Sequence, residues 1–291
     1  MLKRYQHWEK LNKQKKICLL ILALILSALP GLADTRPVSG CITNFEGGQI
    51  DWQTGRIIAY GRAAPKDMSK ADIDSLPGAA RAEASHRIIR MLKKVRIESG
   101  RSVGDYAAQN DIILAGIEKT ARDAVVSKQT YTSALSVELR LEASMRGGFL
   151  QLVLPEEIRQ IPKISMLGAA GAPALKTGRT FTGLVIDVRG LDVTPVLNPY
   201  IVSEQGEAVY TPQFISREFA VQNGVCRYAC SMETALKDDR IGSTPLVFKG
   251  LRKEGKLNTV VVISMSDYHL LEKVEARHQF FRECRVVLVI D

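Results

Sequence analysis

The spacing of apolar and polar residues predicts a hairpin followed by two helices in the first part of the chain. Two β-prone runs flank a short turn that ends at Gly55, so residues 49–61 are expected to form a β-hairpin. From Ala79 the apolar spacing becomes helical, with one continuous stripe formed by Ala80, Ala84, Ile88, Met91, Leu92 and Val95. A second helix is predicted from about Val103 to Asp123, buried through Tyr106, Ile113, Ile117 and Ala121.

Two strands are predicted to follow these helices, at residues 124–130 and 133–143. In the second strand, polar residues alternate with four leucine and valine residues, namely Leu135, Val137, Leu139 and Leu141. This alternation is typical of a half-buried antiparallel strand.

The remainder of the chain is predicted to be rich in short strands. Apolar runs indicate strands at 181–188, 244–251 and 259–264. Ser266 is the expected N-cap of a last helix that continues to about Gln279. The almost fully apolar run Val286–Ile290 predicts a strand in the centre of a sheet.

Domain boundaries follow from a stretch rich in proline, glycine and small residues at 155–179, which indicates a linker. We predict an α+β protein of two domains. The first, at 34–154, is expected to be an antiparallel sheet with two helices, and the second, at 180–291, a β-rich mixed α/β domain.

Residues 1–33 are predicted to be an export signal. Six lysine and arginine residues precede the uncharged run Ile17–Leu29, and Gly31 and Ala33 occupy the −3 and −1 positions of a cut before Asp34. The apolar run is shorter than the roughly 20 residues of a comfortable membrane span. An uncleaved signal anchor is the alternative. The expected location is therefore the periplasm or outer membrane.

The charge of the chain gives little indication of a partner. The formal net charge is +9, but residues 1–33 hold six basic residues and one glutamate, so the chain from Asp34 onward has a charge of +4. A mildly basic protein is not expected to bind nucleic acid for that reason alone.

Four cysteines lie beyond the predicted signal: Cys41, Cys226, Cys230 and Cys284. An even number in an exported protein permits two disulfides, with three alternative pairings. The spacing of Cys226 and Cys230 is a poor match to redox or zinc motifs, and a zinc site would need His269 or His278 together with Cys284. Val38–Cys41 has the residue types of a lipobox, but Asp34–Pro37 separates it from the apolar run, so a soluble, cleaved product is preferred to a lipoprotein.

No catalytic, cofactor-binding or metal-binding residue is predicted. The chain has no nucleophile-elbow, zinc-protease or phosphate-loop motif. If the protein were an enzyme, Asp187, His269 and Glu272 would be the least implausible site. A third hypothesis is that Arg81, Arg87, Arg90, Lys93, Lys94 and Arg96, on the outer side of the first helix, bind anionic lipid or polysaccharide; a merely solvated cationic face is the alternative.

Trp52-x-x-Gly55, Ile57-x-Ala59-x-Gly61 and Ala80-Arg81-x-x-Ala84 resemble the LPP-twenty lipoprotein family and the amino-terminal domain of the flagellar assembly protein FlgT. The pattern continues to Leu141, about a third of the chain, and Phe181–Leu191 looks like an extension found in longer exported members. The resemblance implies a non-enzymatic envelope protein in a flagellar, pilus or secretion context, whose partners are other envelope proteins. It also allows peripheral membrane association.

Overall fold

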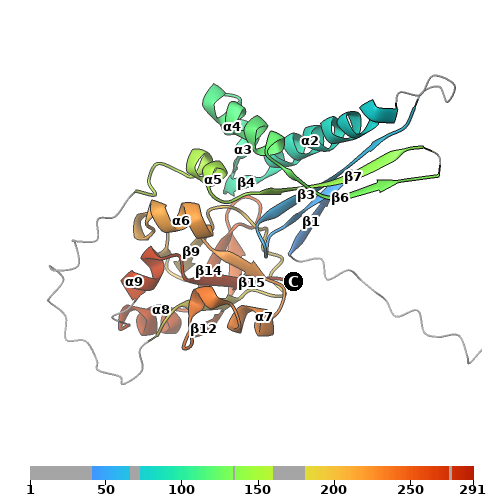
Figure 1. Ribbon diagram of the computed structural model, residues 1–291. Coiled ribbons are helices and arrows are strands. Elements are labelled where there is room, and N and C mark those ends of the chain that lie inside the picture. The colour runs from blue at the N-terminus through green and yellow to red at the C-terminus, as the bar shows by residue number, and fades with distance from the viewer. Residues whose placement is uncertain (1–40, 66–72, 134, 160–180, 275–276) are drawn as a thin grey trace, which may run out of the picture. The chain divides into compact units, whose positions relative to one another are not determined.

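The computed structural model describes residues 41–65, 73–133, 135–159, 181–274 and 277–291 (Figure 1). The predicted export signal and most of the predicted linker, residues 160–179, lie outside these ranges. The described residues belong to one compact unit. For clarity, residues 41–159 are called the first segment and residues 181–291 the second segment.

The first segment contains an antiparallel sheet of five strands in the order β1-β2-β3-β7-β6. Its strands are β1 (Ile42–Phe45), β2 (Gly48–Asp51), β3 (Arg56–Ala63), β6 (Val125–Tyr131) and β7 (Val137–Ser144). Strands β2 and β3 form the predicted hairpin, in which Asp51 lies opposite Arg56. The Asp51 carboxylate accepts hydrogen bonds from the backbone N–H groups of Gln53 and Thr54 at 2.9 and 3.1 Å. Gly55 closes the turn with a φ of +68°.

Helix α2 (Leu76–Lys94) packs against β3 and β7 (Figure 1). All six residues of the predicted apolar stripe are buried, which confirms the helical phase. The helix lies close to β3, because a Cβ atom at Gly61 would come within 1.9 Å of the carbonyl oxygen of Ala80. Only glycine permits this approach. A 3₁₀ turn, η2 (Ile73–Ser75), precedes the helix.

The prediction of one helix from Val103 to Asp123 is wrong. The structure has two helices, α3 (Val103–Ala107) and α4 (Asp111–Arg122). Asn110 separates them because its backbone is extended and its side chain accepts from the N–H groups of Ile112 and Ile113 at 2.9 and 3.4 Å. The predicted contacts of α4 hold nonetheless, since Ile113, Ile117 and Ala121 are buried.

Leu135 was expected in the buried face of the last strand of this sheet, and that expectation is wrong. It is 39% exposed and has a φ of +53°, whereas Val137, Leu139 and Leu141 are buried as predicted. Its N–H donates to the carbonyl of Thr132 at 3.0 Å, so Leu135 belongs to the turn between β6 and β7. Shorter elements of the first segment are β4 (Arg96–Glu98), β5 (Arg101–Ser102) and α5 (Gly148–Val153).

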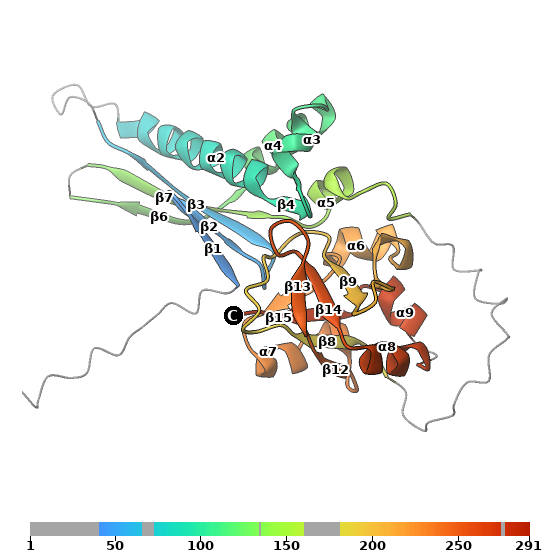
Figure 2. The same cartoon turned by 180° about the vertical axis from the view of Figure 1, so that it is seen from behind.

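The second segment has two four-stranded sheets. Figure 2 labels strands of both, among them β9, β14 and β13 of one and β15, β8 and β12 of the other. One is parallel, in the order β11-β15-β8-β12, and the other is mixed, in the order β10-β9-β14-β13. The bounds are β8 (Leu184–Asp187), β9 (Tyr200–Ser203), β10 (Ala208–Tyr210), β11 (Arg227–Ala229), β12 (Leu246–Lys249), β13 (Arg252–Glu254), β14 (Val260–Ile263) and β15 (Val286–Val289). Strand β15 is fully buried between β11 and β8, as its apolar sequence predicts.

Four helices and two 3₁₀ turns accompany the sheets in the described part of this segment. They are η4 (Pro212–Phe214), α6 (Arg217–Asn223), α7 (Met232–Leu236), η5 (Asp239–Ile241), α8 (Met265–Glu272) and α9 (Arg277–Arg282). Together with the five-stranded sheet and its helices, these elements make the α+β class predicted from the sequence.

The last predicted helix is divided and begins earlier than expected. Ser264, not Ser266, is the N-cap, since its hydroxyl accepts from the N–H of Asp267 at 3.0 Å. The helix to Gln279 is replaced by α8 and α9. At about 100° per residue, Phe280 would lie opposite Leu271 on one continuous helix. Both side chains are buried, and the break between α8 and α9 lets each helix bury its own apolar side.

The two segments share one hydrophobic core and are tied by polar contacts. Arg217 of α6 donates to the carbonyl oxygens of Gln151, Pro155 and Ile158 at 2.7, 3.0 and 3.1 Å. These carbonyls lie in and just after α5, so the guanidinium completes the carboxyl end of that helix. The positions of the predicted domain boundaries stay a prediction, since residues 160–180 are not described.

Candidate functional site

Asp187, the first residue of the least implausible enzyme site, serves its own loop. It ends β8, and its carboxylate accepts from the Arg189 guanidinium at 2.7 and 2.8 Å and from the Arg189 N–H at 3.2 Å. These hydrogen bonds lower the pKa of Asp187 below its usual range. An ionised, arginine-paired carboxylate is a weak general base at neutral pH.

His269 and Glu272 contact each other on α8, with 3.3 Å between Nδ1 and Oε2. Both side chains are substantially exposed. No hydrogen bond or ion pair within the described ranges joins either of them to Asp187. The structure therefore does not assemble the three residues into a common site. Of the other histidines, His86 is exposed on α2, and burial followed by the charge of Arg277 lowers the pKa of His278.

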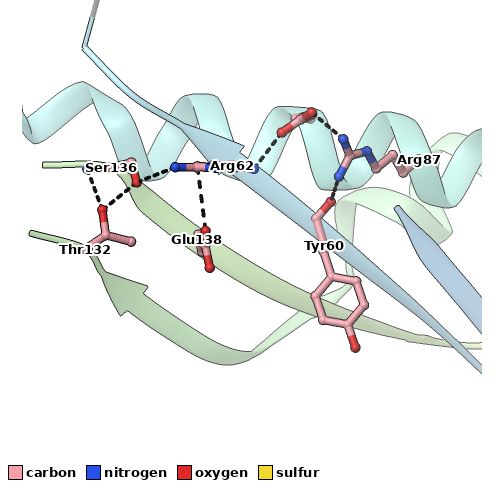
Figure 3. A network of polar contacts seen from close by, with 7 residues as sticks. Tyr60, Arg62, Arg87, Thr132, Ser136 and Glu138 are labelled. Carbon is pink, nitrogen blue, oxygen red and sulfur yellow. Dashed lines mark hydrogen bonds and ion pairs between the residues drawn. The ribbon is translucent and has the colours of Figure 1, made fainter. Parts of the chain in front are cut away.

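The basic face of α2 is partly committed to internal contacts (Figure 3). Arg87 donates to Glu83 at 2.6 Å and to the carbonyl of Tyr60. Glu83 in turn accepts from the N–H of Arg62 at 2.5 Å, so the network ties α2 to β3. Arg81 donates to the carbonyls of Arg122 and Ala124 at 3.0 and 2.9 Å. These contacts show that two of the six predicted cations hold the fold together.

Among the described residues, the cysteines form one disulfide, between Cys41 and Cys230, with 5.6 Å between their Cα atoms. It joins the first segment to the second across 189 positions of sequence. The sulfur of Cys41 is therefore not available as a thiol for lipid attachment. Cys226 and Cys284 are free, and burial raises the pKa of each thiol to about 12. Such thiols stay protonated and unreactive at neutral pH.

Strand β6 lies at the edge of the five-stranded sheet and is unusual in its exposure. It pairs with β7 on one side, and no strand among the described residues pairs with its other side. All seven of its residues are exposed, including Val125 at 67% and Tyr131 at 60%. Natural sheets protect such edges because the unpaired N–H and C=O groups can bind another chain. Here the protection consists of Lys128 and a register shift between Val126 and Lys128.

A polar cleft of about 820 Å³ lies in the second segment and also contacts Gln53 of the β2–β3 turn. Its charged lining comes from β11, α7, η5 and the residues before β15: Arg227, Glu233, Lys237, Asp238, Asp239, Arg240, Glu283 and Arg285. Six of these residues form three ion pairs, namely Arg227 with Asp238 at 3.1 Å, Lys237 with Glu233 at 2.6 Å and Arg285 with Glu283 at 2.8 Å. None of the lining residues is a histidine.

The cleft was not predicted from the sequence. Asp238 and Asp239 are adjacent and do not form a facing pair of carboxylates, so they carried no signal for catalysis. Asp238 instead caps η5 through the N–H of Arg240 at 2.9 Å and pairs with Arg227 of β11. A contact between residues 11 positions apart in an irregular region has no signature in sequence spacing.

The comparisons concern the second segment. A family model described as the second domain of Treponema pallidum Tp0624 matches residues 183–291. No curated protein sequence matches the chain. The match covers 109 of the 291 residues, so it relates the second segment alone to that domain and leaves the resemblance of the first segment as a prediction.

Two observations bear on the location of the protein. Within the described ranges, no helix has both the length and the apolar character needed to cross a membrane. The Cys41–Cys230 disulfide is compatible with an exported protein, because disulfides persist in oxidising compartments.

Proposed function

We propose that the protein is a non-enzymatic module of the bacterial envelope that binds another envelope protein through β6. The observation that carries the proposal is the free edge of this strand. A seven-residue edge with exposed valine and tyrosine side chains is suited to pairing with an extended segment of a partner chain. Main-chain hydrogen bonds would supply affinity, and Val125 and Tyr131 would supply apolar contact.

Three further features support this proposal. The charged and cysteine groups with the clearest chemistry are engaged in ion pairs, a disulfide or burial, rather than poised for acid–base work. The sequence predicts export to the periplasm or outer membrane. The residues Trp52, Gly55 and Gly61, which carry the resemblance to exported assembly proteins, occupy turn and core positions of the same sheet that ends at β6.

The test is site-specific photocrosslinking in cells. A photoreactive residue at Gln129, in the exposed middle of β6, is expected to crosslink one discrete envelope protein. The double substitution Val125→Lys and Tyr131→Lys should abolish that crosslink without lowering the melting temperature, since both side chains are exposed.

The matched control is Val247→Lys, a valine 47% exposed on β12, which is an edge strand of a different sheet. This variant should keep the crosslink. Unchanged crosslinking in the double variant, or equal loss in the control, would show that β6 is not the docking strand.

A further inference from the structure

The lining of the cleft holds four basic and four acidic residues, but the guanidinium groups of Arg146, Arg227 and Arg240 interact with one another at its wall. Arg227 and Arg240 line the cleft, and Arg146 lies close enough for its charge to interact with both. Asp238 is the carboxylate that serves this group: it pairs with Arg227 at 3.1 Å and interacts with the charge of Arg146. Asp238 therefore serves two of the three cations, Arg227 and Arg146.

Arg240 is held without a carboxylate partner of its own among the described residues. Its guanidinium donates to the carbonyls of Gly224 and Cys284 at 3.2 and 3.1 Å and to that of Asn223. Neutral carbonyls fix the orientation of the side chain but do not neutralise its charge. The position of a full positive charge is thus built into the wall.

Arg227 has hydrogen-bonding capacity that the protein leaves unused. Its Nη1 reaches Asp238, but its Nε is buried and has no partner in the described structure. A buried donor without an acceptor costs free energy, which a ligand that supplies an acceptor would recover.

The remaining carboxylates of the cleft do not supply this compensation. Glu233 and Glu283 each pair with a basic neighbour, Lys237 and Arg285 respectively. Asp239 is exposed in the first turn of η5. Burial and then the charge of Arg227 lower the pKa of both Arg240 and Arg146.

We propose that the cleft binds an oxyanion, a carboxylate or phosphate group, between Arg227 and Arg240. Guanidinium groups recognise both of these anions through short, charge-assisted hydrogen bonds. The volume of about 820 Å³ is within the range of small-molecule sites, so the anion can be one group of a larger molecule. The site uses elements other than β6 and does not depend on the function proposed for that strand.

The test is isothermal titration calorimetry of the full chain with sodium phosphate and, separately, with sodium succinate, each at an ionic strength matched with sodium chloride. Saturable binding of at least one anion is expected. Binding of phosphate alone would identify a phosphate group as the ligand, and binding of succinate alone would identify a carboxylate. No saturable heat with either anion would overturn the proposal.

Arg227→Gln should weaken the binding by about tenfold or more, since a charge-assisted hydrogen bond is lost. Arg146→Gln should weaken the binding of the anion by a smaller factor. Because Arg146 has less structural involvement than Arg227, this variant tests the site if Arg227→Gln does not fold. The control Lys273→Gln removes an exposed charge that is not part of the cleft lining and should leave the affinity unchanged. Equal affinities of the wild type and both arginine variants would assign the heat to nonspecific binding and reject the site.

Discussion

The indole ring of Trp52 meets the phenol ring of Tyr228 edge-on, with 5.8 Å between the ring centroids and 75° between the planes. Trp52 lies in the β2–β3 turn, and Tyr228 lies in β11 of the second segment. Each ring is fixed by its polar atom. Trp52 Nε1 donates to Thr43 at 2.9 Å, and the Tyr228 hydroxyl lies 2.9 Å from both the N–H and the carbonyl of Val196. The contact belongs to a core that continues from one segment into the other.

Loss of the Cys41–Cys230 disulfide should destabilise the protein markedly, because the bond closes a loop of 189 positions. The double substitution of both cysteines by serine is expected to cost about 2–5 kcal/mol in the free energy of unfolding. Urea unfolding with and without reductant measures this difference. Reductant should not change the stability of the double variant, and a wild type insensitive to reductant would contradict the prediction.

Limited proteolysis should cut the chain within residues 155–179, because the sequence there is rich in proline and glycine. Fragments near 34–154 and 180–291 should run together on a nonreducing gel and separate only after reduction, since the disulfide joins them. Preferential cutting within α2, or separation of the fragments without reductant, would contradict this prediction.

The two faces of α2 should respond differently to substitution. Leu92 is fully buried, so Leu92→Ala should lower the free energy of unfolding by about 2–5 kcal/mol. Arg90 is exposed, and Arg90→Ala should change it by less than about 0.5 kcal/mol. Arg81→Ala should fall between them at roughly 1 kcal/mol, because it removes hydrogen bonds to two carbonyls. Urea unfolding ranks the three, and equal losses at Leu92 and Arg90 would refute the assignment of the faces.

The free thiols of Cys226 and Cys284 should not react in the native protein, given pKa values of about 12. In a Cys18→Ser background, Ellman's reagent at pH 8 should detect no thiol before denaturation. After denaturation without reductant it should detect the two free cysteines. A rapid native reaction would mean that one of these thiols is accessible and ionised.

Asp187 should contribute stability that depends on pH. Its pKa is lowered in the folded protein, chiefly by hydrogen bonds from Arg189. The stabilisation is therefore present above the unfolded pKa of about 3.9 and is lost as the pH falls through the lower folded value. Urea unfolding should show Asp187→Asn less stable than wild type at pH 6, with the difference shrinking towards pH 3.

The same variant tests whether Asp187 is catalytic. If it stabilises only its own loop, Asp187→Asn should complement a deletion strain whenever the variant folds. A normal melting temperature combined with complete loss of complementation would instead indicate chemistry at this residue, since a general acid or base contributes about 100- to 10,000-fold.

The sequence by itself determined the elements that depend on local periodicity. The β2–β3 hairpin, the buried stripe of α2, and the central position of β15 all follow from the spacing of apolar residues and from glycine at Gly55. The predictions from sequence were wrong where one polar side chain, or a change of the buried side, decided where a helix begins or ends. Asn110 caps the start of α4 after α3 has ended at Ala107, and Leu271 and Phe280 are buried on two separate helices.

Only the tertiary structure decided the cysteine pairing and the cleft. Cys41 and Cys230 are brought together by the packing of two segments, and three pairings were equally compatible with their positions in the sequence. Arg146, Arg227 and Arg240 likewise come from separate elements and interact only because the core holds those elements side by side. The periodicity of a sequence indicates which face of a helix or strand is buried. Long-range contacts depend on which buried faces pack against each other, and this is determined by the packing of the whole core.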